Sequence, residues 1–238
     1  MKLIQLITVP IALAILGAGA IPAAAADEDG VAIAIVYDTS GSMKDPVKDE
    51  AGKSTPKYLI ANRALVAIAD RIQSFATNGP TGSPRKINTG LFVFQKDGPH
   101  AAIPFGPFNA AALKAWARDF SAPNGGTPLG NTLNTAGRAV LKSGLTRKHV
   151  LVITDGMNTI GPDPANTLPK LQQEAAQKQT GLSVHFVAFD VDAKVFNGVR
   201  KLGATVVSAS NESQLNTQLE FILEKKILLE EEEPPTKK

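Results

Sequence analysis

The chain contains no cysteine among its 238 residues, which excludes disulfide bonds, thiol chemistry and a lipoprotein anchor. Its folded part must therefore be stabilised by a hydrophobic core, and with 43% hydrophobic and 20% charged residues the composition provides one. Aromatic residues are scarce at 5%, and we interpret Trp116 and the ten phenylalanines as core residues rather than a stacking surface. The three histidines, His100, His149 and His185, lack the spacing of metal ligands. We expect His149 and His185 before or at the start of strands, in core or surface roles.

The sequence also lacks a strong excess of charge of either sign. Its formal net charge is +3, and without Lys2 it keeps 24 basic and 22 acidic residues. This balance gives no electrostatic reason to expect nucleic acid or an anionic membrane as a partner. Internal repeats are absent from the sequence as well.

The first 26 residues have the pattern of a secretory signal peptide. Lys2 precedes an apolar stretch over residues 3–20, and four alanines at 23–26 lead into acidic residues. An uncleaved membrane anchor is the alternative, because the stretch is just long enough to span a bilayer. We therefore expect an exported protein, periplasmic or extracellular and of a bacterial type, with a domain over 27–229 and a charged tail over 230–238.

Strand patterns alternate with helical patterns along the rest of the chain. Such alternation predicts an α/β fold: a doubly wound, mostly parallel sheet of about six strands, with one antiparallel edge strand and helices on both faces. Residues 44–57 contain two prolines and are predicted to form a loop. The predicted strands are 31–37, 87–94, 101–105, 149–154, 182–189 and 204–208; the predicted helices are 58–76, 109–120, 129–141, 165–179, 193–202 and 211–229.

The strand predicted over residues 31–37 is followed at once by a cluster of oxygen-bearing side chains. Its apolar, β-branched composition is typical of a strand buried on both faces. Asp38, Ser40 and Ser42 come next, and Gly41 allows a tight turn among them. Ligands of open α/β sheets bind beyond the carboxyl ends of the strands, where this cluster would lie.

Asp38-x-Ser40-x-Ser42 resembles the first part of the metal-ion-dependent adhesion site (MIDAS) of von Willebrand factor A (vWA) domains. Two further segments carry the resemblance, in the order that the family shows. Residues 125–128, Gly-Gly-Thr-Pro, are similar to the loop that supplies a ligand threonine, here Thr127. Residues 150–156 are similar to the strand that ends in a ligand aspartate, here Asp155.

The resemblance implies that strand 31–37 lies beside strand 149–154 and that the three segments hold one divalent cation. The serines and Thr127 would bind it directly, and one or both aspartates would act through water. Hydroxyls and carboxylates are hard oxygen ligands, which suit Mg²⁺, Mn²⁺ or Ca²⁺. An open coordination position would then accept an Asp or Glu carboxylate from a partner protein.

Each segment taken alone has a simpler interpretation. Asp38 and Ser40 are common helix N-caps, Thr127 precedes a proline that can start a helix, and Asp155-Gly156 is a common turn. Asn124, Thr154 and Asn158 can orient metal ligands or make ordinary turn hydrogen bonds. Only the combination favours a metal site.

The leading functional hypothesis is a non-enzymatic, metal-dependent adhesion or protein-binding module. The first alternative is a Mg²⁺-dependent phosphoryl transferase or phosphatase with Asp38 as nucleophile. That chemistry requires a second carboxylate two residues later, where this sequence has Ser40. The second alternative is a structural subunit of an envelope complex whose metal serves stability. The oligomeric state is left open.

Overall fold

The computed structural model describes residues 27–78 and 83–229, and a six-stranded sheet forms their centre. The strand order is β5-β4-β1-β6-β7-β8. Strand β5 runs antiparallel to β4, and the other neighbouring pairs are parallel. This confirms the predicted fold class. The strands are β1 (Glu28–Tyr37), β4 (Ile87–Gln95), β5 (Gly98–Pro107), β6 (Leu145–Thr154), β7 (Ser183–Phe189) and β8 (Thr205–Ala209).

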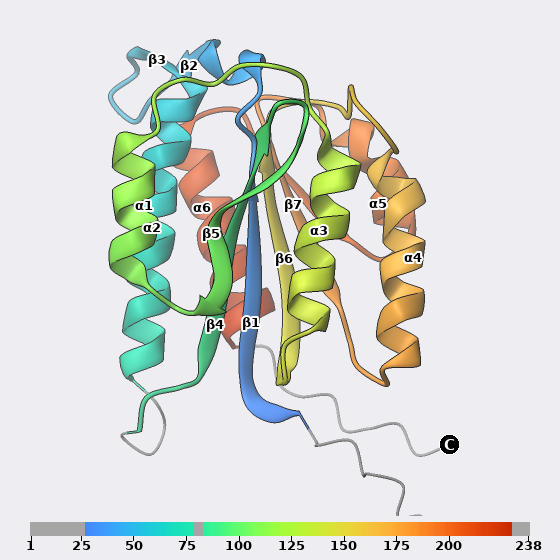
Figure 1. Ribbon diagram of the computed structural model, residues 1–238. Helices are drawn as coiled ribbons and strands as arrows, with labels where there is room; N and C mark the ends of the chain where they lie inside the picture. Colours follow the sequence, from blue (N-terminus) through green and yellow to red (C-terminus); the bar gives the residue numbers. More distant parts are fainter. Residues whose placement is uncertain (1–26, 79–82, 230–238) are drawn as a thin grey trace, which may run out of the picture.

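Helices cover both faces of the sheet (Figure 1). One face packs against α1, α2 and α6, and the other packs against α3, α4 and α5. A π-helical segment, η3 (Leu223–Leu228), continues α6, so the last predicted helix is regular only in its first part. The α-helices are α1 (Lys57–Thr77), α2 (Ala110–Asp119), α3 (Leu129–Leu141), α4 (Pro164–Gln177), α5 (Asn197–Lys201) and α6 (Glu212–Ile222), and two 3₁₀ turns are η1 (Gly41–Lys44) and η2 (Ala193–Phe196).

Strand β1 lies at the middle of the sheet and is buried on both faces. Successive side chains of a strand point to opposite faces. Ile33, Ile35 and Tyr37 therefore enter the core beneath α1 and α6, whereas Ala32 and Ala34 enter the core beneath α3. All five are fully buried. Large side chains thus fill one face, while small ones allow α3 to pack closely against the other.

The prediction of a loop over residues 44–57 is wrong. After η1, the chain forms a two-stranded antiparallel sheet of β2 (Pro46–Lys48) and β3 (Ser54–Pro56). The Asp49 carboxylate organises the turn between them, because it accepts hydrogen bonds from the backbone of Ala51 and Lys53 and from the Thr55 hydroxyl. Strands of three residues are too short to produce a recognisable alternation, so the prolines dominated the prediction.

The prediction that His149 precedes or begins a strand is also wrong, because β6 starts four residues earlier at Leu145. The polar run 146–148 concealed this part of the strand. His149 and His185 are both buried, with Nδ1 of the first 3.3 Å from Nε2 of the second.

The predicted signal peptide over 1–26 and the predicted tail over 230–238 lie outside the described residues. Within residues 27–78 and 83–229, no helix combines the length and the apolarity that crossing a membrane requires.

Candidate metal centre

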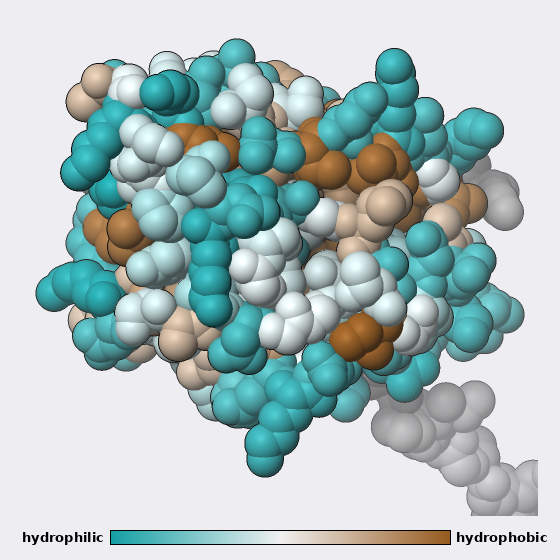
Figure 2. All heavy atoms as spheres, turned by 90° about the horizontal axis from the view of Figure 1, so that it is seen from above, coloured by the Kyte–Doolittle hydropathy of each residue, from teal (hydrophilic) through white to brown (hydrophobic). Residues whose placement is uncertain are grey.

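Strands β1 and β6 end side by side, at the edge of the sheet that is uppermost in Figure 1. Tyr37 pairs with Ile153, and the backbone N–H of Asp38 donates to the Ile153 carbonyl at 3.0 Å. Asp38 and Asp155 therefore leave neighbouring strands at the same edge, as predicted. Seen from above, this face is largely hydrophilic, with separate hydrophobic patches (Figure 2).

Four of the five predicted ligands form a continuous series of polar contacts. The Ser40 N–H donates to Asp38 Oδ1 at 2.8 Å, and the Ser40 and Ser42 hydroxyl oxygens lie 3.1 Å apart. The Ser42 hydroxyl donates to Asp155 Oδ1 at 2.8 Å. Thr154 completes the series, because its hydroxyl donates to Asp38 Oδ2 at 2.6 Å. Thr154 thus orients a predicted ligand, and its hydroxyl also takes part in the turn, because it accepts from the Gly156 N–H at 3.3 Å.

Thr127, the fifth predicted ligand, belongs to a loop that is fixed against this series. The Gly41 N–H donates to the Gly125 carbonyl at 3.1 Å, and the Asn124 N–H donates to the Thr39 carbonyl at 2.8 Å. Gly125 has a φ of +78°, a conformation that favours glycine. Thr127 itself is buried.

Residues after Asp155 hold the other side of that loop. The Thr127 N–H donates to the Thr159 hydroxyl at 2.8 Å, and the Thr159 N–H donates to the Thr127 carbonyl at 3.0 Å. Sequence reasoning missed Thr159. Asn124 makes an ordinary local bond, from its amide group to the Ala122 carbonyl. Asn158 donates to the Gly161 carbonyl and also accepts from the Gly130 N–H at 3.1 Å, which ties its loop to the start of α3.

The two carboxylates are buried and close enough to influence each other. Asp38 is fully buried and Asp155 nearly so. Loss of solvation, and then the negative charge of Asp155, raise the pKa of Asp38 to about 6, although hydrogen bonds from Ser40 and Thr154 oppose the rise. The negative charge of the two carboxylates is therefore only partly stabilised, because burial removes the solvent around them.

Lys57 is the main residue that sequence reasoning missed. Its ammonium lies 2.8 Å from Asp155 Oδ2, 3.5 Å from Asp190 Oδ2 and 3.9 Å from Asp45 Oδ2, and its side chain is only 5% exposed. Burial alone would lower the pKa of Lys57, but the bond to Asp155 and the charges of the three aspartates outweigh burial and raise it. Lys57 thus remains an ammonium ion that balances part of the site's charge.

Lys57 falls within the predicted loop 44–57, so the sequence holds no signal for its role. It is the first residue of α1, where the positive end of the helix dipole disfavours a cation. The three aspartates that stabilise a lysine at this position are brought to it only by the tertiary structure.

The donor set fits a hard divalent cation that is bound partly by hydroxyls. In the part of the chain that the structure describes, no three His, Cys, Asp or Glu side chains are grouped so that they alone could hold a metal. Asp38 and Asp155 would supply charge to such a cation, and Ser40, Ser42 and Thr127 would supply neutral oxygens. A cation bound here would offset the buried negative charge.

Comparison with protein families gives a match to the von Willebrand factor type A domain over residues 32–222. A comparison with curated protein sequences found no match. Among solved structures, the chain is similar to the PilB minor pilin from Streptococcus sanguinis, with 16% identity and a TM-score of 0.62 over 83% of this chain and 61% of that one. The chain thus spans less than two thirds of that pilin.

Two further structures share the fold. The vWF domain of the type V pili tip protein Mfa5 from Porphyromonas gingivalis has 15% identity and a TM-score of 0.60 over 87% of this chain and 98% of that one. Proximal thread matrix protein 1 from the mussel byssus, whose MIDAS motif is occupied by zinc, has 20% identity and a TM-score of 0.60 over 84% of this chain and 48% of that one. At these identities the similarity establishes the fold alone.

Proposed function

Because the chain belongs to the von Willebrand factor type A domain family, we propose that its sheet-edge site binds a divalent cation and through it captures an acidic residue of a partner protein. The observation that supports this most is the series of contacts joining Asp38, Ser40, Ser42 and Asp155 from two adjacent strands. The proposed metal residues are Asp38, Ser40, Ser42, Thr127 and Asp155.

In this proposal the side chains have different roles. The hydroxyls of Ser40, Ser42 and Thr127 bind the cation, while Asp38 and Asp155 balance its charge, one or both through water. Such oxygen ligands favour Mg²⁺, with Mn²⁺ and Ca²⁺ as alternatives. The bound cation supplies a positive charge to which a partner's Asp or Glu carboxylate can bind. The zinc in the mussel protein's MIDAS motif makes Zn²⁺ a necessary comparison in any titration.

The environment of Asp38 supports a binding role over phosphoryl transfer. Asp38 is fully buried, and its two carboxylate oxygens accept hydrogen bonds from Ser40 and Thr154. A nucleophile needs an exposed oxygen, and an acid–base partner at the position of Ser40 would be needed as well. We therefore propose a non-enzymatic module.

We further propose that the domain acts outside the cytoplasm, in the periplasm or beyond, as its N-terminal sequence pattern predicts. Pilus proteins among the structural neighbours are consistent with an adhesive role at a cell surface.

Isothermal titration calorimetry tests the metal site directly. Mg²⁺, Mn²⁺, Ca²⁺ and Zn²⁺ are titrated into the chain, into Asp38→Ala and into Asp119→Ala, which removes an exposed carboxylate at the end of α2. We expect binding to be lost in Asp38→Ala and unchanged in Asp119→Ala. Equal titrations for all three proteins would refute the site.

Melting temperatures and partner capture separate the bridging role from a purely stabilising one. If an acidic peptide is captured with Mg²⁺ and released by EDTA, the cation forms part of the binding surface. If capture persists in EDTA while the melting temperature falls, the metal only stabilises the fold. Thr127→Ala should weaken peptide capture more than metal binding, and equal losses would contradict bridging.

A further inference from the structure

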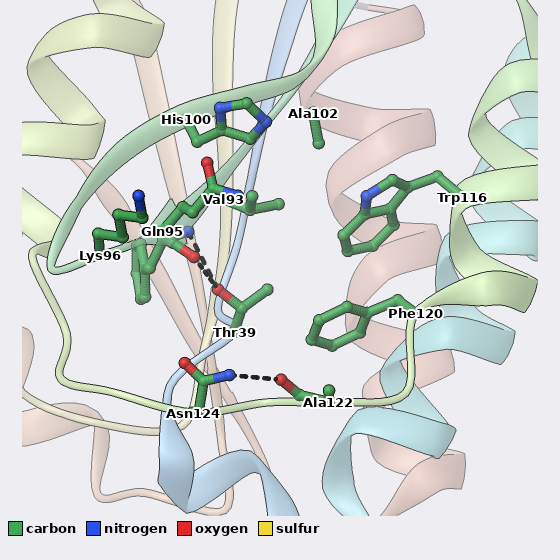
Figure 3. A pocket seen from close by; sticks show the side chains of 11 residues that line it. Thr39, Val93, Gln95, Lys96, His100, Ala102, Trp116, Phe120, Ala122 and Asn124 are labelled. Carbon is green, nitrogen blue, oxygen red and sulfur yellow. Dashed lines mark hydrogen bonds between the residues drawn. The ribbon is translucent and has the colours of Figure 1, made fainter.

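A pocket of about 490 Å³ lies beside the candidate metal centre, between α2 and the hairpin formed by β4 and β5 (Figure 3). Trp116 and Phe120 of α2 form one wall, and Val93 and Ala102 of the two strands lie opposite them. The volume is within the range of ligand pockets and exceeds what one aromatic side chain needs.

The α2 wall is an ordered aromatic surface. The rings of Trp116 and Phe120 stack with centroids 4.9 Å apart and an interplanar angle of 9°. Tyr37 packs edge-on against both of them from the core, which fixes their orientation. Both rings remain partly accessible from the pocket side. A rigid, partly exposed aromatic surface favours an aromatic occupant through offset or edge contacts.

The base of the pocket is formed by Thr39, whose hydroxyl is already engaged. It donates to the Phe94 carbonyl at 2.8 Å and accepts from the Phe94 N–H at 3.0 Å. The base therefore favours an apolar group over a polar one.

The titratable side chains that line the pocket are basic, although the Asp97 carboxylate lies close by, where it accepts from the Gly126 N–H. Lys96 and His100 line it together with the amides of Gln95 and Asn124, and among the described residues that line it none is acidic. An approaching acidic segment would thus be attracted by Lys96, whereas a basic segment would be repelled.

The pocket and the metal centre are built from the same two loops. Thr39, at the base of the pocket, stands between the proposed metal residues Asp38 and Ser40. Asn124 lines the pocket three residues before Thr127, and its N–H is bonded to the Thr39 carbonyl. A protein segment that places a carboxylate at the metal therefore brings its neighbouring residues to the pocket.

We propose that this pocket binds an aromatic side chain of the partner segment that presents its carboxylate to the cation, so that the module recognises an acidic residue with an aromatic residue close to it. This inference rests on the proposed function, because the carboxylate fixes where the segment lies. The pocket adds a contact that metal bridging alone would not select.

Model peptides test the inference, and Trp116 reports on the pocket because it is the only tryptophan of the chain. Blocked peptides carry one Asp and one Phe separated by one to four glycines; matched versions replace Phe by Ala, or Asp by Asn. Binding is followed by Trp116 fluorescence and by calorimetry, in Mg²⁺ and in EDTA. At the best spacing we expect the Asp–Phe peptide to bind at least about tenfold more tightly than the Asp–Ala peptide, as ring burial predicts.

A substitution that fills the pocket provides a second test. Ala102→Phe places a ring in the pocket from a partly exposed position on β5, and Ala115→Phe adds the same ring to the solvent-facing side of α2. We expect Ala102→Phe to abolish the advantage of the Asp–Phe peptide and to leave Mg²⁺ titration and Asp–Ala binding unchanged. Ala115→Phe should leave all three unchanged.

The outcomes distinguish the two proposals. If the Asp–Phe and Asp–Ala peptides bind equally at every spacing in Mg²⁺, the pocket inference is wrong and metal bridging stands. If the Asn–Phe peptide changes Trp116 fluorescence equally in Mg²⁺ and EDTA while Asp adds nothing, metal bridging is wrong and the pocket still binds the ring. If no peptide binds under either condition, both are refuted.

Discussion

Replacing Lys57 by methionine tests the charge balance of the site most sharply. The substitution keeps most of the aliphatic stem and removes the ammonium that lies 2.8 Å from Asp155 Oδ2. The side chains of Lys57 and Asp155 are 5% and 0% exposed, so their pairing is buried. Removing one partner of a buried ion pair costs about 3 kcal/mol or more, because the other charge stays buried without compensation.

Without metal, we therefore expect the free energy of unfolding of Lys57→Met to fall by about 3 kcal/mol. For a domain of this size that loss corresponds to roughly 6–12 °C in melting temperature. Lys48→Met, which removes an exposed ammonium from β2, is the matched control and should melt as the wild type does.

In contrast to its effect on stability without metal, we expect Lys57→Met to improve Mg²⁺ binding. At 2.8 Å the ammonium competes for the Asp155 carboxylate by about 1.5 kcal/mol even at the dielectric constant of water, so its removal should raise Mg²⁺ affinity about tenfold. Saturating Mg²⁺ should then raise the melting temperature of Lys57→Met by roughly 3–6 °C more than that of the wild type.

Differential scanning calorimetry in EDTA and in Mg²⁺ measures both effects on the same samples. The reasoning is wrong if Lys57→Met melts like the wild type in EDTA. It is also wrong if Mg²⁺ stabilises the variant no more than the wild type, because Lys57 would then be a positioning group that the metal site needs.

Three further predictions concern the core and the ligands. Burial lowers the pKa of His149 to about 3 and of His185 to about 4. Below pH 6.5 the unfolded chain therefore binds two protons that the folded chain does not bind, so the free energy of unfolding decreases as the pH is lowered. Without metal, proton uptake by folded Asp38 near pH 6 offsets one of them, leaving a loss of about 1.4 kcal/mol per pH unit between pH 6 and 4, measurable by urea unfolding. Thr154→Val removes the hydrogen bond to Asp38 and should weaken Mg²⁺ binding about tenfold in calorimetry. Gly130→Ala places a methyl carbon 1.9 Å from the Pro162 carbonyl oxygen. It should lower the free energy of unfolding by about 3 kcal/mol, measured by urea unfolding.

Each of these predictions has a control. Asp38→Asn removes the offsetting proton and should double the pH slope to about 2.7 kcal/mol per unit, and an unchanged slope would contradict the assignment. Thr135→Val removes an exposed hydroxyl of α3 and should leave Mg²⁺ binding intact. Gly144→Ala adds a methyl group with no atom within 4 Å, so a loss equal to that of Gly130→Ala would exclude a steric cause.

The parts of the fold that the sequence predicted are those specified by local pattern. The buried run at 31–37 and the helical spacing over 58–76 identified β1 and α1 closely, because period and burial agree there. The β2–β3 hairpin was missed because the Asp49 side chain organises its turn, and such side-chain bonding leaves little trace in hydropathy.

The candidate site was also predictable only in part, namely for the residues that follow the strand ends. Asp38, Ser40, Ser42 and Asp155 come together because two strand ends meet, which follows from the topology. Lys57 was not found, since its role depends on three aspartates that lie far from one another in the sequence.

The alanines of β1 have a consequence that reaches the rim of the molecule. Helix α3 rests on the face of the sheet that Ala32 and Ala34 form, and Thr127 stands two residues before that helix begins. How deeply α3 settles on the sheet therefore sets the position of the loop that carries Thr127. The two methyl groups that Ala34→Val adds to the interior would lift the helix and shift that loop, so the packing of the interior controls the position of a proposed metal ligand.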